Sequence, residues 1–286
     1  MTIRAHAKIN LDLRLQKRRP DGFHPIDTFF IRVDIADTLK AEPTTDGQLT
    51  LTIEGDDLLS LGEDNLILRA ARALQVHHRG LGARLYLQKE IPQGAGLGGG
   101  SSDAAATLLL LRKLWALPIS DSELNKIGSE LGSDVPFFLQ PYAARATGRG
   151  EILKPIHLTH LPWAVLLHPG FLSPTGLAYS LYATNPQMGP EGPPLFLNTL
   201  EGQTHEIRPR NDLEPSVERK FIWITSAREW LGRQGGVLAA RMSGSGSTVY
   251  GLFSTEEEAR QVTEKAEEFF GIETWIQKAR LLGGDE

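Results

Sequence analysis

The chain has 286 residues, of which 41% are hydrophobic and 23% are charged, and its formal net charge at pH 7 is −5. This composition is typical of a globular protein with a full core, and the length is enough for about two domains of ordinary size. The negative charge argues against a nucleic-acid surface. Because the chain has no cysteine, disulfides, thiolate metal sites and cysteine nucleophiles are excluded.

The N-terminal segment carries Arg4, Lys8 and Asn10 and lacks the apolar core of a signal peptide. No stretch approaches the roughly 18 apolar residues that span a membrane. We therefore expect a cytoplasmic protein without a membrane or nucleic-acid partner. None of the eight histidines belongs to a His-Glu-x-x-His arrangement, so the residues identify no metal ligands. The sequence leaves open whether the protein is a monomer or a homodimer.

Strands are predicted over much of the first 88 residues, with one helix among them. Four apolar residues from Ile9 to Leu15 alternate with polar ones, which is the pattern of a half-buried strand. Glu63 or Asp64 is expected to cap the helix. The further strands are predicted at 29–33, 49–53 and 84–88, and the helix at 65–76.

The residue pattern changes near Lys154-Pro155, and we divide the chain there into domains 1–155 and 156–286. The second domain is predicted to contain alternating strands and helices in the order strand, helix, strand, strand, helix, strand. This order is typical of a ferredoxin-like unit, so the fold class is α+β. The elements are expected at 163–167, 215–231, 236–239, 248–253, a helix opened by a capping box at Thr255–Glu258, and 273–277.

The most informative segment is a glycine-rich stretch that follows a predicted strand and leads into an Ala/Leu-rich helix. Glycines let an anion approach the backbone, and a helix start adds unpaired N–H groups and the positive end of the dipole. The segment therefore predicts a phosphate site, with the helix capped by Ser101 or Ser102. It consists of Pro92, Gln93, Gly94, Ala95, Gly96, Leu97, Gly98, Gly99, Gly100, Ser101 and Ser102.

Two common phosphate loops do not fit this segment. The glycine spacing matches a dinucleotide fingerprint, but that motif requires a second strand, ending in an acidic residue, after the helix. Instead Pro118 follows, and then a second helix opened by the capping box Ser120–Glu123. A Walker A loop is excluded because no Gly-Lys-Ser/Thr closes the segment.

The segment resembles the central loop of the galactokinase, homoserine kinase, mevalonate kinase and phosphomevalonate kinase (GHMP) superfamily. Ala7–Leu11 is similar to its first motif, and Met242–Thr248 is similar to its third. We expect the third to form a tight turn that packs beside the loop. Four further segments narrow the resemblance to the family of kinases that phosphorylate a cytidyl diphosphate of methylerythritol. They are Arg19–His24 with Thr28, Glu63–Ile67, Gly132–Phe138, and His168–Gly170 followed by Pro174-Thr175.

The resemblance implies a two-domain GHMP kinase fold, with an N-terminal unit like domain 2 of ribosomal protein S5 and a C-terminal ferredoxin-like unit. It implies an ATP- and Mg²⁺-dependent phosphotransferase with an alcohol acceptor. The acceptor would be the 2-hydroxyl of 4-diphosphocytidyl-2-C-methyl-D-erythritol, in the non-mevalonate route to isoprenoids. Two alternatives remain: another GHMP small-alcohol kinase, of the phosphomevalonate or homoserine type, or a non-catalytic nucleotide-binding regulator.

Lys8 and Asp134 match the catalytic positions of the family. Asp134 would orient the substrate hydroxyl and accept its proton, while the Lys8 cation would hold Asp134 ionised and stabilise the transferring phosphoryl group. The Val135-Pro136 step is expected to keep the chain extended after Asp134. Without the resemblance, Lys8 would be interpreted as a solvated lysine and Asp134 as a residue that organises a turn.

The remaining site residues also follow from the resemblance. The loop from Pro92 to Ser102 would carry the ATP phosphates, with Ser101 or Ser102 near Mg²⁺ and Asp103 as a capping or metal-water residue. The adenosine would be held by Asn65, Leu66 and Lys89. The cytidyl substrate would stack on Phe23 and hydrogen-bond to His24. Its other contacts would be Asn10, Asp134, Thr175 and, as a second aromatic wall, Tyr179.

Overall fold

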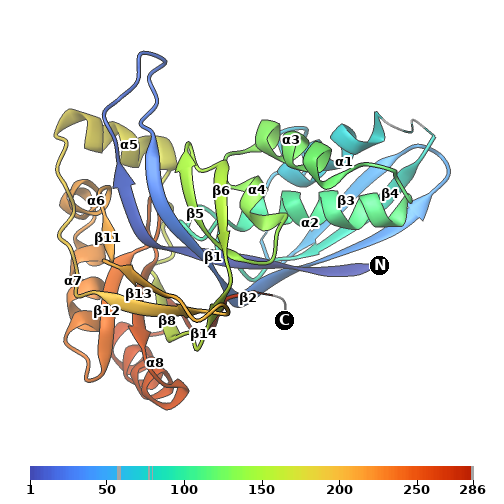
Figure 1. The fold of residues 1–286 in the computed structure, drawn as a ribbon. Helices are drawn as coiled ribbons and strands as arrows, with labels where there is room; N and C mark the ends of the chain where they lie inside the picture. Colours follow the sequence, from blue (N-terminus) through green and yellow to red (C-terminus); the bar gives the residue numbers. More distant parts are fainter. Residues whose placement is uncertain (57–58, 77, 79, 285–286) are drawn as a thin grey trace. The chain divides into compact units, whose positions relative to one another are not determined.

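A computed structural model describes residues 1–56, 59–76, 78 and 80–284 (Figure 1). These residues form two compact units, neither of which is a continuous segment. Unit 1 comprises 1–7, 35–93 and 98–141, and unit 2 comprises 8–34, 94–97 and 142–286. The chain passes from one unit to the other within its first two strands and within the glycine loop. The predicted single division between residues 155 and 156 stays a prediction.

Unit 1 combines parts of β1 and β2 with two further strands and four helices, which gather beside β3 and β4 in Figure 1. Strand β4 pairs antiparallel with β2 and parallel with β3. A parallel pair needs a crossover connection, and α1 supplies it. The elements are β1 (Thr2–Leu15), β2 (Ile26–Thr44), β3 (Leu49–Glu54), α1 (Leu66–Gln75), β4 (Gly82–Gln88), α2 (Gly99–Leu114), α3 (Asp121–Leu131) and α4 (Val135–Phe138).

Two predicted helix caps in unit 1 are wrong. Helix α1 is capped by Asn65, whose side chain accepts a hydrogen bond from the N–H of Ile67, rather than by the acidic residues before it. Helix α2 begins directly after Gly98, which is left-handed and makes no side-chain cap bond. Ser101 and Ser102 therefore lie inside its first turn. The capping box of α3 is confirmed, because it depends only on residues three apart.

Unit 2 contains an antiparallel sheet with the strand order β14-β8-β13-β12. Helices α7 and α8, orange to red in Figure 1, contact its strands. This order and the helical connections confirm the predicted ferredoxin-like unit and the α+β class. The elements are β5 (Ala143–Gly148), β6 (Ile152–Ile156), β7 (Leu158–Thr159), β8 (Trp163–His168), α5 (Thr175–Thr184), β9 (Leu195–Thr199), β10 (Thr204–Ile207), β11 (Arg210–Asn211), α6 (Glu214–Lys220), α7 (Ile222–Gly232), β12 (Val237–Met242), β13 (Val249–Phe253), α8 (Glu256–Phe270) and β14 (Trp275–Leu282).

Two predicted elements of unit 2 are corrected by the structure. The helix expected over 215–231 is two helices, α6 and α7, because Phe221 between them has non-helical dihedral angles (φ −122°, ψ 87°). The last strand begins at Trp275 and continues to Leu282, beyond its predicted end. The capping box at Thr255–Glu258 opens α8 as expected. None of the helices in the described ranges has the length and apolar run needed to cross a bilayer.

Strand β1 differs from its prediction in a way that matters for the site. Its apolar residues Ile9 and Leu11 are buried, as the alternation indicates, but the polar residues between them are buried as well. Lys8, Asn10 and Asp12 are each less than 5% exposed. A strand buried on both faces must satisfy the polar side chains internally, since burying an unpaired polar group is costly. The partners of these side chains define the candidate site.

Candidate active site

Lys8 is the cation at the centre of the site in unit 2. Its ammonium donates to Asn10 Oδ1 at 2.6 Å and to the carbonyl oxygen of Gly96 at 2.9 Å, and it lies 5.3 Å from the centre of the Phe30 ring. The backbone N–H of Lys8 also donates to the carbonyl of Leu97. Lys8 is therefore attached to the glycine loop through both its backbone and its side chain.

The glycine loop in turn packs against the turn of the third motif. Ser243 Oγ donates to the Gly96 carbonyl at 3.0 Å, and the N–H of Thr248 donates to the Ala95 carbonyl at 3.1 Å. Gly96 has φ +77°, and a Cβ there would lie 2.2 Å from the carbonyl oxygen of Ser243. The close approach requires glycine at this position. The expected packing of the Met242–Thr248 segment beside the loop is thus observed.

Asn211, which belongs to no motif recognised in the sequence, also holds this turn. Its Nδ2 donates to the carbonyls of Met242 and Gly244, both at 2.8 Å. Glu214 accepts a hydrogen bond from the N–H of Met242, and burial raises the pKa of this carboxyl to about 7. A single asparagine on a two-residue strand carries no periodic signal, so only the structure identifies it.

In unit 1 the second part of the loop becomes the first turn of α2. Gly98 caps the helix with φ 71° and ψ 16°, and Gly99–Ser102 are helical. The predicted loop is thus shorter than the eleven-residue segment from which it was inferred. The first N–H groups of a helix have no partner within it, and Gly98 has no side chain that could cap them. Pro92 and Gln93 lead into this turn from the end of β4.

A buried charge cluster lies beside the start of α2. The ammonium of Lys89 forms an ion pair with Asp37 and lies 3.4 Å from a carboxylate oxygen of Asp103. A Cβ on Gly99 would lie 3.0 Å from the same ammonium nitrogen. Asp37 also accepts hydrogen bonds from the N–H groups of Glu90 and Ile91. The cluster therefore fixes the backbone that enters the loop.

Asp103 is neither a cap nor an exposed residue. It is 2% exposed, and burial raises its pKa to about 8, with Lys89 lowering it and Asp37 raising it further. The buried carboxyl of Asp103 therefore holds its proton more strongly than an exposed aspartate does. The expected role of Asp103 as a capping residue is wrong, because the chain turns into the helix five residues earlier, at Gly98.

The other residues predicted to hold adenosine lie beside this helix start. Asn65 is engaged as the cap of α1, with its Nδ2 donating to the carbonyl of Ser60 at 2.7 Å. Leu66 is partly exposed, and a Cβ on Gly100 would lie 3.6 Å from its Cδ1. Leu66 and Lys89 thus lie beside the first turn of α2, Asn65 caps the neighbouring helix α1, and the contact of all three with adenosine stays a prediction.

Asp134 lies in unit 1, two residues after Gly132, the C-terminal cap of α3. Its dihedral angles are helical, and Val135–Phe138 form the short helix α4. The predicted extended chain is therefore wrong at this point. Pro136 is tolerated because it occupies the first turn, where a helix needs no N–H donor. Asp134 is partly exposed.

Aromatic residues predicted to bind the substrate belong to unit 2. Phe23 is 48% exposed, and the guanidinium of Arg149 lies 3.8 Å from the centre of its ring. The ring of His24 packs edge-on against Tyr182 at 5.3 Å. Tyr179, one turn earlier on α5, packs against the core of unit 2 instead. The assignment of Tyr179 as an aromatic wall stays a prediction, and Arg149 and Tyr182 are residues that the sequence reasoning missed.

The hydrogen bonds of His24 determine which ring nitrogen carries the proton. Nδ1 lies 3.0 Å from the carbonyl oxygen of Gln16, and a carbonyl only accepts, so Nδ1 is the donor. Nε2 of the neutral ring is then an acceptor, and it is buried without a hydrogen-bond partner in the described part of the chain. A ligand N–H group could reach this acceptor only if the groups that cover Nε2 moved aside.

Thr175 opens α5, and its hydroxyl lies 3.1 Å from Ser245 Oγ in the third-motif turn. Ser173 Oγ donates to the Ser245 carbonyl, and its N–H donates to the Gly94 carbonyl. These bonds connect the start of α5, the turn and the loop. Lys8, Asn10 and Thr175 are thus all attached to one hydrogen-bonded framework in unit 2.

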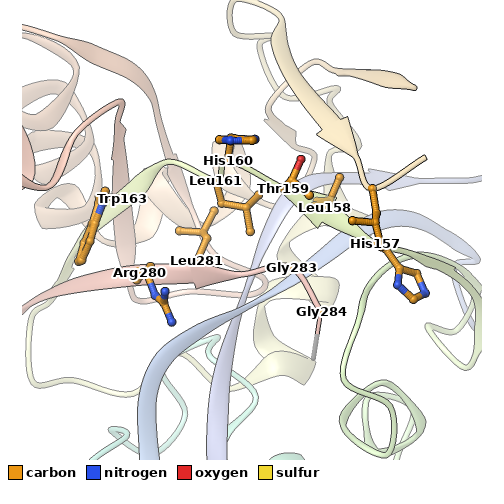
Figure 2. A pocket seen from close by; sticks show the side chains of 11 residues that line it. His157, Leu158, Thr159, His160, Leu161, Trp163, Arg280, Leu281, Gly283 and Gly284 are labelled. Carbon is orange, nitrogen blue, oxygen red and sulfur yellow. The ribbon is translucent and has the colours of Figure 1, made fainter. Parts of the chain in front are cut away.

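A pocket of about 570 Å³ in unit 2 lies elsewhere (Figure 2). It is lined by residues around β7 and by the end of β14, among them His157, Trp163 and Arg280. None of the predicted site residues belongs to it. No group of three or more histidine, aspartate or glutamate side chains suitable for a metal ion occurs among residues 1–56, 59–76, 78 and 80–284.

Comparisons with known proteins agree with this framework. The family model described as "GHMP kinases N terminal domain" matches residues 65–141, and "GHMP kinases C terminal" matches residues 197–272. The matched ranges include the loop, Asp134 and the third-motif turn.

The chain is 41% identical over 286 residues to a 4-diphosphocytidyl-2-C-methyl-D-erythritol kinase from Cereibacter sphaeroides, covering 98% of each protein. It is 37% identical to the enzyme of the same name from Methylacidiphilum infernorum, covering 97% of this chain and 96% of the other. A crystal structure of 4-(cytidine 5'-diphospho)-2C-methyl-D-erythritol kinase superposes with a TM-score of 0.80 at 37% identity over all of both chains. A homoserine kinase from Cytophaga hutchinsonii shares the fold (TM-score 0.70, 16% identity, 99% of this chain and 96% of the other). The chain belongs to the GHMP kinases and, among them, to the 4-diphosphocytidyl-2-C-methyl-D-erythritol kinase family.

Proposed function

We propose that the protein transfers the γ-phosphoryl group of ATP to the 2-hydroxyl of 4-diphosphocytidyl-2-C-methyl-D-erythritol, giving the 2-phosphate and ADP in the non-mevalonate route to isoprenoids. Full-length relatives of this name support the assignment. The structural observation that carries it is the hydrogen bond from Lys8 to the carbonyl of Gly96, which fixes a buried cation on the glycine loop. A phosphotransferase needs positive charge of this kind beside the transferred group.

Two residues carry the transfer in this proposal. Lys8 stabilises negative charge on the phosphoryl group, while Asp134 orients the 2-hydroxyl and accepts its proton as the new O–P bond forms. Phosphoryl transfer has a loose transition state with little bonding to the nucleophile, so positioning contributes more than basicity. Asp134 is partly exposed and therefore accessible to a substrate hydroxyl.

ATP use follows from membership of the kinase family, and we assign its phosphates to the loop from Pro92 to Ser102. The support is the uncapped first turn of α2, whose N–H groups are suited to an anion. We assign Mg²⁺ to phosphate oxygens, water and the hydroxyl of Ser101, since Mg²⁺ commonly takes only one or two protein ligands. When bound, the ion would neutralise phosphate charge.

The tautomer of His24 supports recognition of the cytidine part of the substrate. In this proposal the groups that cover His24 Nε2 move aside, and the neutral ring accepts from the exocyclic amine of cytosine, whereas uracil presents a carbonyl oxygen at that position. Phe23 is exposed on the same segment and can stack on the base. We assign Asn10 and Thr175 to polar contacts with the rest of the substrate.

An ATP-consumption assay with a panel of acceptors tests the proposal. We expect turnover of the cytidyl substrate and very poor turnover of methylerythritol phosphate, which lacks the cytidine. The matched uridyl analogue is expected to have a KM about 5- to 150-fold higher, since a buried donor–acceptor mismatch costs roughly 1–3 kcal/mol. Equal turnover of phosphomevalonate or homoserine would refute the substrate assignment. Nucleotide binding without any turnover would indicate a regulator. The cytoplasmic location and the choice between monomer and homodimer stay predictions.

A further inference from the structure

We propose that Thr28 is a positioning residue for the reaction, because it sets the orientation of the Asn10 amide and thereby the place of the Lys8 ammonium. This inference rests on the proposed function of Lys8. Thr28 lies on β2 and is completely buried, so it cannot touch a substrate. It acts entirely through its neighbours.

The three side chains form a chain of short hydrogen bonds within unit 2. Lys8 Nζ donates to Asn10 Oδ1 at 2.6 Å, and Asn10 Nδ2 donates to Thr28 Oγ1 at 2.8 Å. Thr28 Oγ1 then donates to the backbone carbonyl of Asp12 at 2.6 Å. All three bonds are buried.

The direction of this chain is fixed at its far end. The hydroxyl of Thr28 has one proton, and the Asp12 carbonyl can only accept, so that proton is used there. Thr28 Oγ1 must therefore accept from Asn10, and only the NH₂ group of the amide can donate. This places Asn10 Oδ1 toward Lys8. Without the hydroxyl, Asn10 Nδ2 would lose this acceptor, and the Lys8 ammonium alone would orient the amide.

The other neighbours of Asn10 restrain its backbone rather than its side-chain amide. The Tyr250 hydroxyl donates to the backbone carbonyl of Asn10 at 3.0 Å, and the Gly96 carbonyl accepts from Lys8. A Cβ on Gly244 would lie 3.2 Å from Lys8 Nζ and 3.3 Å from Asn10 Oδ1, so the turn closes over both groups. The orientation of the amide is thus set by two groups, the Lys8 ammonium at Oδ1 and the Thr28 hydroxyl at Nδ2.

The kinetic test compares Thr28→Val, which has nearly the same shape but no hydroxyl, with Thr28→Ser, which keeps the hydroxyl. We expect kcat to fall about 10- to 100-fold in Thr28→Val, as for other displaced catalytic groups, with KM for ATP nearly unchanged. Thr28→Ser should retain most of the activity. In an Asn10→Ala background, Thr28→Val should have little further effect, because the group through which it acts is absent. A full additional loss in that background would overturn the proposal.

A second measurement does not depend on turnover or on the folding of a variant. In the wild-type protein, ¹⁵N-resolved NMR should show slow hydrogen exchange for a side-chain amide proton of Asn10, identified by its disappearance in Asn10→Asp. Thr28→Val should accelerate that exchange, and Thr28→Ser should not. Fast exchange in the wild type would refute the hydrogen bond to Thr28. If kinase activity is absent but this exchange is slow, the proposed function is refuted, whereas the hydrogen bond from Asn10 to Thr28 is supported.

Discussion

The ammonium of Lys8 and the carbonyl oxygen of Gly96 are joined by a hydrogen bond of 2.9 Å. The same carbonyl oxygen accepts a hydrogen bond from Ser243 Oγ. Gly96 therefore couples the position of the lysine to the conformation of the loop and of the third-motif turn. A displacement of the loop backbone at this point moves the cation as well.

Substitution of Gly96 tests this coupling. In Gly96→Ala a Cβ would lie 2.2 Å from the Ser243 carbonyl oxygen, in addition to the strain of an alanine at φ +77°. We expect kcat/KM to fall at least about ten-fold, as for groups displaced by an ångström or less. Gly202→Ala is the matched control, since Gly202 has φ +79° but no atom within 4 Å of the added Cβ. It should show the loss of stability from strain, about 1–2 kcal/mol, with normal kinetics. Equal kinetics of the two variants would contradict the coupling.

Replacement of Asp134 tests its assignment to the transfer step. Asp134→Asn preserves the shape of the side chain but removes the proton acceptor. We expect kcat to fall by about two to four orders of magnitude while ATP affinity, measured by calorimetry, stays within about two-fold. Asp121→Asn, at an exposed carboxylate on α3, serves as the control and should leave both quantities unchanged. Wild-type kcat in Asp134→Asn would remove this residue from the mechanism.

Phe23 provides a test of base stacking. Phe23→Leu keeps an apolar side chain without a π face, and we expect KM for the cytidyl substrate to rise about 5- to 150-fold, which corresponds to a stacking energy of 1–3 kcal/mol. Phe23→Tyr retains the ring and should behave like the wild type. KM for ATP is the internal reference and should not change. A rise in KM that is equal in both variants would exclude stacking as the cause.

Asp103 makes stability depend on pH. Burial raises its pKa to about 8, above the ordinary value of 3.8 that applies in the unfolded chain. Its stabilising contribution is therefore complete below about pH 4 and is lost as the pH rises through 8. Between these values unfolding releases a proton, and stability falls by up to about 1.4 kcal/mol per pH unit.

Asp103→Asn imitates the neutral acid and should remove this dependence. Urea unfolding should give similar stabilities for variant and wild type at pH 4, and a variant that is more stable by several kcal/mol at pH 8.5, on the order of 1.4 kcal/mol for each pH unit between. Asp37→Asn is the contrasting variant. Because Asp37 accepts from two backbone N–H groups and pairs with Lys89, its replacement should destabilise at both pH values. Parallel pH profiles for Asp103→Asn and wild type would show that Asp103 is ionised in the fold.

Local patterns predicted the features that depend on local physics. The capping boxes at Ser120 and Thr255 involve residues three apart, and the strand order of unit 2 follows from alternating elements in sequence. The glycine loop was found from its local composition, whereas the turn of the third motif was found from the family resemblance. The boundaries between elements were less accurate, as Gly98 shows by starting α2 earlier than the expected serine caps.

The contents of the site depended on contacts between distant residues. The alternation around Lys8 showed a polar strand face but not that the face is buried, since burial depends on segments more than 80 residues away. Tyr182 and Tyr179 are equally aromatic and one helical turn apart, so the sequence could not choose which one meets His24. Asp37 belongs to no motif, and only strand pairing brings it to Lys89.

Helices α1, α3 and α8 each begin with a side chain that accepts from their first turn, whereas α2, like α4, α5, α6 and α7, has no such bond at its N-cap. On the proposed assignment, the nucleotide is the missing cap of that helix. Binding then completes a piece of secondary structure, and release of the product returns the helix end to water. On this assignment, the N–H groups at the start of α2 are hydrogen-bonded to nucleotide and to water in turn during each catalytic cycle.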